Sequence, residues 1–119
     1  MPSDFVSNWQ TQARKGILVL SVLNALRGER LYGYEIVKRL GDVAGLSIAE
    51  GTIYPLMSRL QKEGLVESSL EPSPEGPARK YYRLTADGEA ALDRIDEAWD
   101  DIVEGVEALR RKHDEGGAA

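Results

Sequence analysis

The 119-residue sequence predicts a mainly α-helical fold with a small β-wing, that is, a winged helix-turn-helix followed by a C-terminal dimerisation helix. Two helical stretches, 31–40 and 47–63, are separated by a short turn that contains two glycines. Two short runs rich in β-formers follow, and a final stretch repeats apolar residues at spacings of three and four. The expected parts are a winged helix-turn-helix domain over 1–84, a dimerisation helix over 85–113 and a disordered tail over 114–119.

The composition excludes several classes of function. The chain has no cysteine, so disulfides, thiolate catalysis and cysteine-ligated metals are excluded, and its one histidine, His113, cannot build a metal site alone. No paired carboxylates fall in a predicted cleft, so we expect neither an enzyme nor a cofactor. The longest apolar run, 16–22, is far shorter than the ~20 residues of a membrane span. We expect a cytoplasmic protein without membrane contact.

The negative charge is concentrated at one end of the chain. Residues 1–83 contain 11 Lys and Arg against 9 Asp and Glu, a balance of +2, whereas residues 84–119 contain 4 against 11, a balance of −7. A phosphate backbone would therefore meet the first two thirds of the chain, and the C-terminal helix would point away from it.

The first predicted helix runs from Trp9 to Leu26 and stops at Gly28. Its apolar stripe has a spacing of three and comprises Ile17, Leu20, Leu23 and Leu26. Residues 1–8 form either a frayed turn or an arm. Trp9, ahead of the stripe, is expected to pack on a partner helix.

The second helix, 31–40, turns Ile36, Val37 and Leu40 inward and Lys38 and Arg39 outward. Residues 41–46 then supply the turn of the helix-turn-helix.

The third helix is the centre of the fold. Ser47 and Glu50 have the spacing of a capping box, which predicts a start at Ser47, and Gly64 is placed to end the helix in a left-handed conformation. Pro55 costs about 3 kcal/mol inside a helix and is tolerable only in the first two turns. The helix therefore either bends at Pro55 or begins with Thr52 as its cap, and we favour the first alternative.

One side of this helix faces the core through Ile53, Leu56 and Leu60, with Met57 beside them. The other side carries hydrogen-bonding and cationic groups. The candidate DNA-binding residues on this side are Thr52, Tyr54, Pro55, Ser58, Arg59 and Lys62. We expect Tyr54 and Ser58 to meet base edges.

Residues 66–70 and 79–84 are predicted as two strands, and the loop 71–78, with three prolines and a glycine, as the tip of the hairpin. One of Tyr81 and Tyr82 should face the core and the other solvent. Arg79 and Lys80 stand beside the third helix, which favours contact between this wing and phosphate or the minor groove.

Thr85 is expected to cap the last helix. Its apolar residues have the 3-4-3-4-3 spacing of a coiled-coil seam and comprise Leu92, Ile95, Trp99, Ile102, Val106 and Leu109. So narrow a seam has too little of its own domain to pack against. We expect these residues, together with Trp9, to bury against a second subunit.

The assembled motifs resemble the PadR family of bacterial transcriptional regulators from about Ile17 to Leu109. The segments that carry the resemblance are Tyr32-Gly33-Tyr34-Glu35-Ile36, Gly51-Thr52-Ile53-Tyr54-Pro55-Leu56, Arg59-Leu60-Gln61-Lys62-Glu63-Gly64-Leu65-Val66, and Arg79-Lys80-Tyr81-Tyr82-Arg83-Leu84-Thr85 followed by Gly88. The resemblance implies a homodimer in which the third helix reads the major groove of double-stranded DNA. A two-fold operator would match it, with half-sites about one helical turn apart.

The single C-terminal helix is similar to the short subfamily, in which some multidrug-sensing members stack flat aromatic drugs on a tryptophan of this helix. Trp99 sits at the matching place. Two indoles at the seam would hold the helices apart and leave a gap beside Ile95 and Ile102, and the acids Asp96, Asp100 and Glu104 would favour an aromatic or cationic effector. The candidate ligand-binding residues are Trp99, Ile95, Ile102 and Asp100.

The wing departs from the family's usual pattern at Glu71 and Glu75, which are acidic. The favoured function is a dimeric DNA-binding repressor released by a small hydrophobic or aromatic ligand. The alternative is a winged-helix module that binds a protein instead of DNA.

Overall fold

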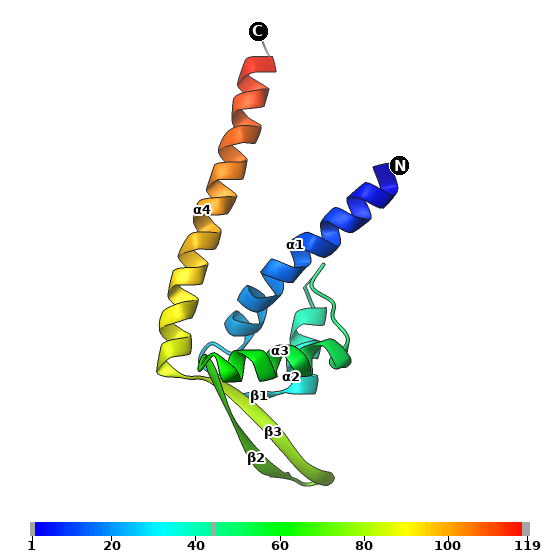
Figure 1. Ribbon diagram of the computed structural model, residues 1–119, viewed down its shortest axis with the longest axis vertical. Helices are drawn as coiled ribbons and strands as arrows, with labels where there is room; N and C mark the ends of the chain where they lie inside the picture. Colours follow the sequence, from blue (N-terminus) through cyan, green and yellow to red (C-terminus); the bar gives the residue numbers. More distant parts are fainter. Residues whose placement is uncertain (1, 44, 118–119) are drawn as a thin grey trace.

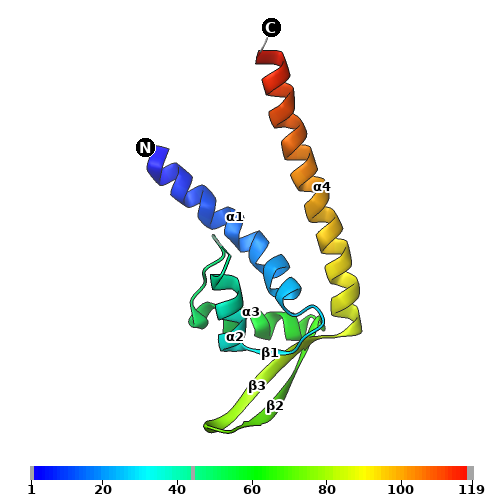
Figure 2. The same cartoon turned by 180° about the vertical axis from the view of Figure 1, so that it is seen from behind.

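The computed structural model describes residues 2–43 and 45–117. Within these ranges, it describes the exposure of side chains from Ser3 to Lys112. The elements in order are α1 (Pro2–Ala25), β1 (Leu31–Tyr32), α2 (Gly33–Gly41), α3 (Glu50–Lys62), β2 (Val66–Ser73), β3 (Gly76–Leu84) and α4 (Ala86–Gly117). Helices α2 and α3 pack beside the base of α1, and the three-stranded antiparallel sheet, in the order β1-β3-β2, extends from their lower side (Figure 1, Figure 2). This arrangement confirms the predicted winged helix-turn-helix.

The hydrophobic core draws on all four helices and the sheet. Its central members are the residues with no exposed side chain, namely Val22, Leu23, Ile36, Ile53, Met57 and Leu92. Met57 is thus a central residue of the inward side of α3, and Leu56 is only half-buried. Tyr82 of β3 is buried and Tyr81 is half-buried, as the alternation of the strand predicts.

Helix α1 begins at Pro2, so the first residues continue the helix and do not form a frayed turn. A proline is favoured at the first helical position because its missing N–H would have no partner there, and Asp4 in the first turn complements the helix dipole. The helix ends near Gly28, which has a φ of +74°.

Both predicted starts of α3 are wrong. The helix begins at Glu50, Ala49 is the N-cap residue, and no side chain caps the end. Residues 46–49 form neither helix nor strand, and Ala49 is extended; Leu46 and Ile48 are half-buried against the core, whereas Ser47 and Ala49 are exposed. Packing of these two apolar side chains holds the segment out of the helix and prevents the capping box. Pro55 consequently lies in the second turn.

The sheet is larger than predicted. Leu31 and Tyr32 form a short strand that pairs with Tyr82 and Tyr81, and the hairpin strands extend through Pro72 and Pro77, so that only Pro74 and Glu75 make the turn. The register shifts between Glu71 and Ser73, where Pro72 faces two residues of β3. The extra residue belongs to β3, at a point beyond its pairing with β1, and a bulge there accommodates proline because no ladder hydrogen bond is needed.

A set of short-range hydrogen bonds connects α3, β2 and α4. Gly64 adopts a φ of +78°, and the Leu65 N–H donates to the Leu60 carbonyl at 3.0 Å, which ends α3. The Leu65 carbonyl in turn accepts the Thr85 N–H at 3.1 Å. The Thr85 hydroxyl oxygen accepts the Gly88 N–H at 2.9 Å, and this bond confirms Thr85 as the cap of α4.

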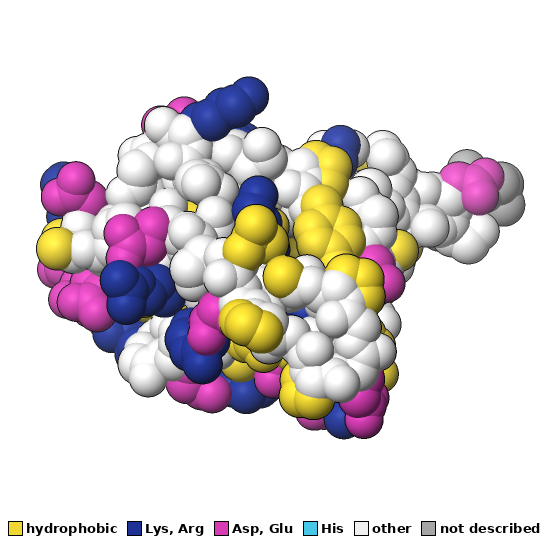
Figure 3. All heavy atoms as spheres, turned by 90° about the horizontal axis from the view of Figure 1, so that it is seen from below, with side chains coloured by type: hydrophobic (Ala, Val, Ile, Leu, Met, Phe, Trp, Pro, Cys, Tyr) yellow, Lys and Arg dark blue, Asp and Glu magenta, His cyan; other side chains and the backbone are white. Residues whose placement is uncertain are grey.

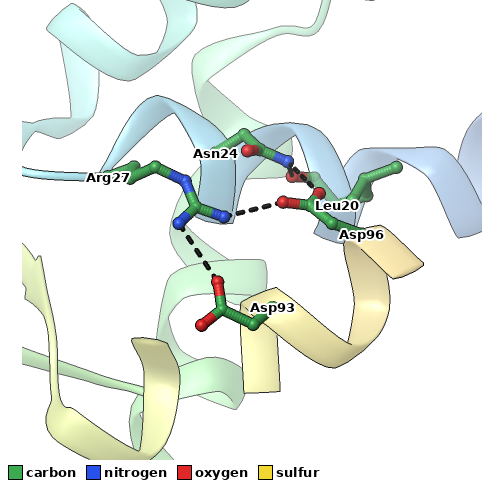
Figure 4. A network of polar contacts seen from close by, with 5 residues as sticks. All are labelled: Leu20, Asn24, Arg27, Asp93 and Asp96. Carbon is green, nitrogen blue, oxygen red and sulfur yellow. Dashed lines mark hydrogen bonds and ion pairs between the residues drawn. The ribbon is translucent and has the colours of Figure 1, made fainter. Parts of the chain in front are cut away.

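The first turns of α4 lie against α1, and the two helices then diverge like the arms of a V (Figure 1). At the point of contact, the Arg27 guanidinium donates to Asp93 at 3.2 Å and to Asp96 at 2.7 Å, and the Asn24 amide also donates to Asp96, at 2.8 Å (Figure 4). α4 continues to Gly117, beyond the predicted end at 113; positions 118 and 119 lie outside the described residues. The molecule measures 65 × 34 × 22 Å, and its length comes from this helix.

Candidate nucleic-acid interface

The exposed side of α3 carries the predicted DNA-binding residues. Pro55, Ser58 and Lys62 are all exposed and, at spacings of three and four, follow the middle of this side. Thr52 and Arg59 are also exposed and lie toward the edge next to α1, where Thr52 and Arg14 line one small cavity. The side therefore presents hydroxyl and cationic groups to an incoming ligand.

Tyr54 lies at the opposite edge and has a second role. A Cβ atom added at Gly33 would lie 2.6 Å from the ring of Tyr54, so this ring packs directly on the start of α2. Its side chain is 47% exposed. Burial, and to a smaller extent Tyr54, raise the pKa of the Tyr82 phenol. Tyr54 thus spaces α2 from α3, and only part of its ring is available to a base.

The two predicted cations of the wing lie on opposite faces of the sheet. Lys80 is the neighbour of Leu70 across the hairpin and shares the face of buried Tyr82, whereas Arg79 shares the outer face with Tyr81. Among the described residues, no carboxylate lies within ion-pair distance of Arg59, Lys62, Arg79 or Lys80. Their charges are available to phosphate groups.

Most other arginines of the first two thirds are already paired with acids. Arg83 donates to Glu67 at 2.5 Å, Arg39 to Glu29 at 2.8 Å, and Arg30 forms an ion pair with Glu71. The hydrogen bond from Arg39 holds the pKa of Glu29 below its usual value. Seen from below, the end of the molecule with α3 and the hairpin accordingly shows basic side chains scattered among acidic and apolar ones (Figure 3). The interface is a set of separate cations and not a uniform basic surface.

The sequence did not point to Tyr32 and Arg30 as part of this region. The guanidinium carbon of Arg79 lies 4.5 Å from the centre of the Tyr32 ring, and that of Arg30 lies 4.4 Å from the centre of the Tyr81 ring. The only available signal was the Leu31-Tyr32 pair of β-formers, which is too short to predict a strand.

A second feature is an apolar groove of about 570 Å³ between α1 and α4. Its walls include Trp9 and Ile17 from α1 and Ile95, Trp99 and Ile102 from α4. The two indoles, one on each helix, therefore belong to the same groove.

Two predicted residues of the C-terminal helix do not fit their assigned roles. Asp100 does not line the groove, because it lies one position after Trp99 and points elsewhere on the helix. Leu92 is completely buried in the core of its own chain, so it has no surface to offer a second subunit. Ile102, Val106 and Leu109 are exposed, and Ile95 and Trp99 are half-buried.

Within residues 2–43 and 45–117, no helix is long and apolar enough to cross a membrane. No group of three or more metal-binding side chains occurs in the same part of the chain.

The fold and this interface define a winged helix-turn-helix protein with a protruding C-terminal helix. The sequence profile of the transcriptional regulator PadR-like family matches residues 22–94. The chain therefore belongs to the PadR-like family, which consists of transcriptional regulators and not of enzymes.

Individual relatives agree with this assignment. A PadR family transcriptional regulator from Eggerthella lenta superposes with a TM-score of 0.80 at 40% identity, over 90% of this chain and 93% of that one. The transcriptional regulator Rv3488 of Mycobacterium tuberculosis is 30% identical over 73% of this chain and 79% of its own length. Bacillus subtilis PadR, solved in complex with operator DNA, gives a TM-score of 0.61 at 28% identity, over 66% of this chain and 44% of that one.

Proposed function

We propose that this protein is a dimeric DNA-binding repressor that is released from a two-fold operator by a small apolar or aromatic ligand. The observation that carries DNA binding is the exposed side of α3, with Ser58 in its middle and Arg59 and Lys62 without acidic partners among the described residues. Hydroxyls can bond to base edges and free cations to phosphates. The operator complex of Bacillus subtilis PadR supports the same use of the fold.

Exposed apolar groups on both arms of the V support a homodimer. Trp9 is 61% exposed, and Ile102, Val106 and Leu109 on α4 are between 49% and 69% exposed. Contiguous apolar surface of this kind marks a protein interface. A second copy that packs between the arms would bury these side chains and would present two α3 helices to two half-sites.

The groove beside Trp9 and Trp99 supports the ligand site. Its walls are apolar apart from Glu107, which accepts a hydrogen bond from Arg110 at 3.1 Å. Asp96 is occupied by Arg27 and Asn24. The chemistry of the walls therefore favours a flat, apolar ligand, and a positive charge on the ligand would gain little.

DNA binding is tested by fluorescence anisotropy with a duplex from the promoter upstream of the protein's own gene and with a random duplex, at two salt concentrations. We expect tighter binding to the promoter duplex. Ser58→Ala should reduce this preference, whereas Lys62→Ala should weaken both complexes and make the salt dependence shallower by about one unit. Absence of binding to either duplex at low salt would favour the alternative, a protein-interaction module.

The ligand site is tested in a Trp9→Phe background, in which Trp99 is the sole indole. A planar aromatic dye at micromolar concentration should quench the fluorescence of Trp99 and weaken binding to the promoter duplex. Trp99→Leu in the wild-type chain is the comparison variant. It should still dimerise and bind DNA, but the dye should no longer weaken its binding to the promoter duplex. Unquenched Trp99, or a monomeric Trp99→Leu variant, would assign this residue a purely structural role.

A further inference from the structure

The outer face of the sheet carries two pairs in which an arginine lies over a tyrosine. Leu31 and Tyr82 are register partners and are buried, so Tyr32 and its partner Tyr81 point away from the core. Arg79 lies over the ring of Tyr32 and Arg30 over the ring of Tyr81. The two rings are 5.4 Å apart and meet edge to face at 74°.

The two arginines differ in their electrostatic environment. Glu71 is the cross-strand neighbour of Arg79, yet its carboxylate forms an ion pair with Arg30. Among the described residues, Arg79 has no carboxylate partner of its own. One pair is therefore neutralised and the other keeps its positive charge, although both use the same contact between a guanidinium and a ring.

The pair with the free charge is connected to α3. Tyr32 leads directly into α2, and the ring of Tyr34 stacks on that of Tyr32 at 6.4 Å and 22°. Between these two tyrosines, Gly33 receives the ring of Tyr54 from α3. Tyr54 of α3 and Arg79 of the wing thus contact neighbouring residues, Gly33 and Tyr32, at the start of α2.

Stacking on Tyr32 has a direct consequence for binding. A guanidinium on an aromatic face keeps the N–H groups at its edge free, and it has already lost part of the rotamer freedom that a phosphate contact would remove. Contact with a phosphate would therefore cost Arg79 less conformational entropy than it would cost an arginine without such stacking.

We propose that Tyr32 is a positioning residue for contact between the wing and the DNA backbone, that it acts by holding Arg79, and that Glu71 withdraws Arg30 from the same contact. This proposal rests on the proposed function, because it requires that the chain binds duplex DNA. It assigns no base recognition to Tyr32, so its effect is the same on every sequence.

The proposal is tested by the affinity for a random-sequence duplex as a function of salt. Tyr32→Leu should weaken binding about two- to fivefold, in keeping with the loss of one exposed cation–π contact, and Tyr32→Phe should restore it. Tyr81→Leu is the matched control and should leave affinity unchanged, because Arg30 is neutralised. Thermal unfolding of each variant shows whether the fold is intact.

The decisive measurement is a double-mutant cycle. If Tyr32 acts through Arg79, the double variant Tyr32→Leu, Arg79→Ala binds no more weakly than Arg79→Ala alone. Arg79→Lys keeps the charge, loses the planar stacking and should fall to the affinity of Tyr32→Leu. The positioning role would be overturned if the losses of affinity from Tyr32→Leu and Arg79→Ala added up in the double variant. An Arg79→Lys variant with wild-type affinity would also overturn it.

Glu71→Gln tests the other half of the proposal without changing either ring. It should free Arg30, strengthen binding to the random duplex and steepen the salt dependence by about one unit, and Arg30→Ala in the same chain should remove this gain. An unchanged salt dependence would show that Arg30 does not reach the backbone. A wild-type protein that binds no duplex would reject the proposed function itself, a result distinct from all of these.

Discussion

Gly88→Ala should disturb the protein far from the site of the substitution. A Cβ atom at this position would lie 1.9 Å from the carbonyl oxygen of Leu65. This oxygen cannot turn away freely, because it accepts the Thr85 N–H at 3.1 Å at the junction of β2 and α4. The start of α4 must therefore move.

The size of the movement follows from the geometry of the helix. Comfortable non-bonded contact needs about 3.5 Å, so Gly88 has to shift by about 1.5 Å. Leu92, which is fixed in the core, lies about 6 Å further along the axis and Leu109 about 25 Å beyond Leu92, at 1.5 Å per residue. A tilt about Leu92 that relieves the clash would displace Leu109 by about 6 Å. The exposed apolar edge of α4 would lose its alignment with a second copy.

Two measurements check this expectation. Overpacking costs about 1–3 kcal/mol and the better helix propensity of alanine returns about 1, so we expect the free energy of unfolding by urea to fall by about 1 kcal/mol. Sedimentation should show weaker self-association. Gly105→Ala is the control: nothing lies within 4 Å of its added Cβ, and it should stabilise the protein. A Gly88→Ala variant with wild-type stability and association would refute the steric argument.

Four further outcomes are expected. Leu92→Ala should cost about 2–5 kcal/mol of unfolding free energy because it opens a cavity in the core, whereas Leu109→Ala should leave the stability of the protomer unchanged and weaken association in sedimentation. Arg27→Ala breaks partly exposed ion pairs with Asp93 and Asp96, so thermal unfolding should show a loss of at most about 1 kcal/mol. The raised pKa of Tyr82 means that the folded state holds the phenol proton more tightly than the unfolded state does. The free energy of unfolding should therefore stay constant with respect to this group below pH ~10 and fall above it. The fall should be less steep in Tyr82→Phe.

The sequence was sufficient where one local pattern had no competitor. The left-handed Gly64, the Thr85 cap and the alternation that buries one of Tyr81 and Tyr82 all follow from rules that act over a few residues, and the structure confirms them and buries Tyr82. The start of α3 was mispredicted because two local patterns competed. Ser47 and Glu50 favour a capping box, whereas Leu46 and Ile48 alternate with polar or small residues as in an extended chain. Leu46 and Ile48 pack against the core, and this contact keeps the segment out of the helix.

Other features depend on contacts that are distant in sequence. Whether Leu92 faces its own core or a second copy cannot be read from a heptad spacing, because both environments select the same apolar residues. The contact of Arg79 with Tyr32 can be predicted only when it is known which face of β3 each residue occupies. The short strand at Leu31 is defined only by its pairing with Tyr82.

Strand β1 reaches no further along β3 than Tyr81, so the rest of the hairpin is a ribbon of two strands that lacks a third. An isolated ribbon of two strands is only marginally stable in water. Its outer half, from Glu71 through the Pro74-Glu75 turn, should therefore bend and twist at little energetic cost. Such compliance would let the wing tip follow minor grooves of different width, so that one protein could tolerate variation in the DNA that flanks its half-sites.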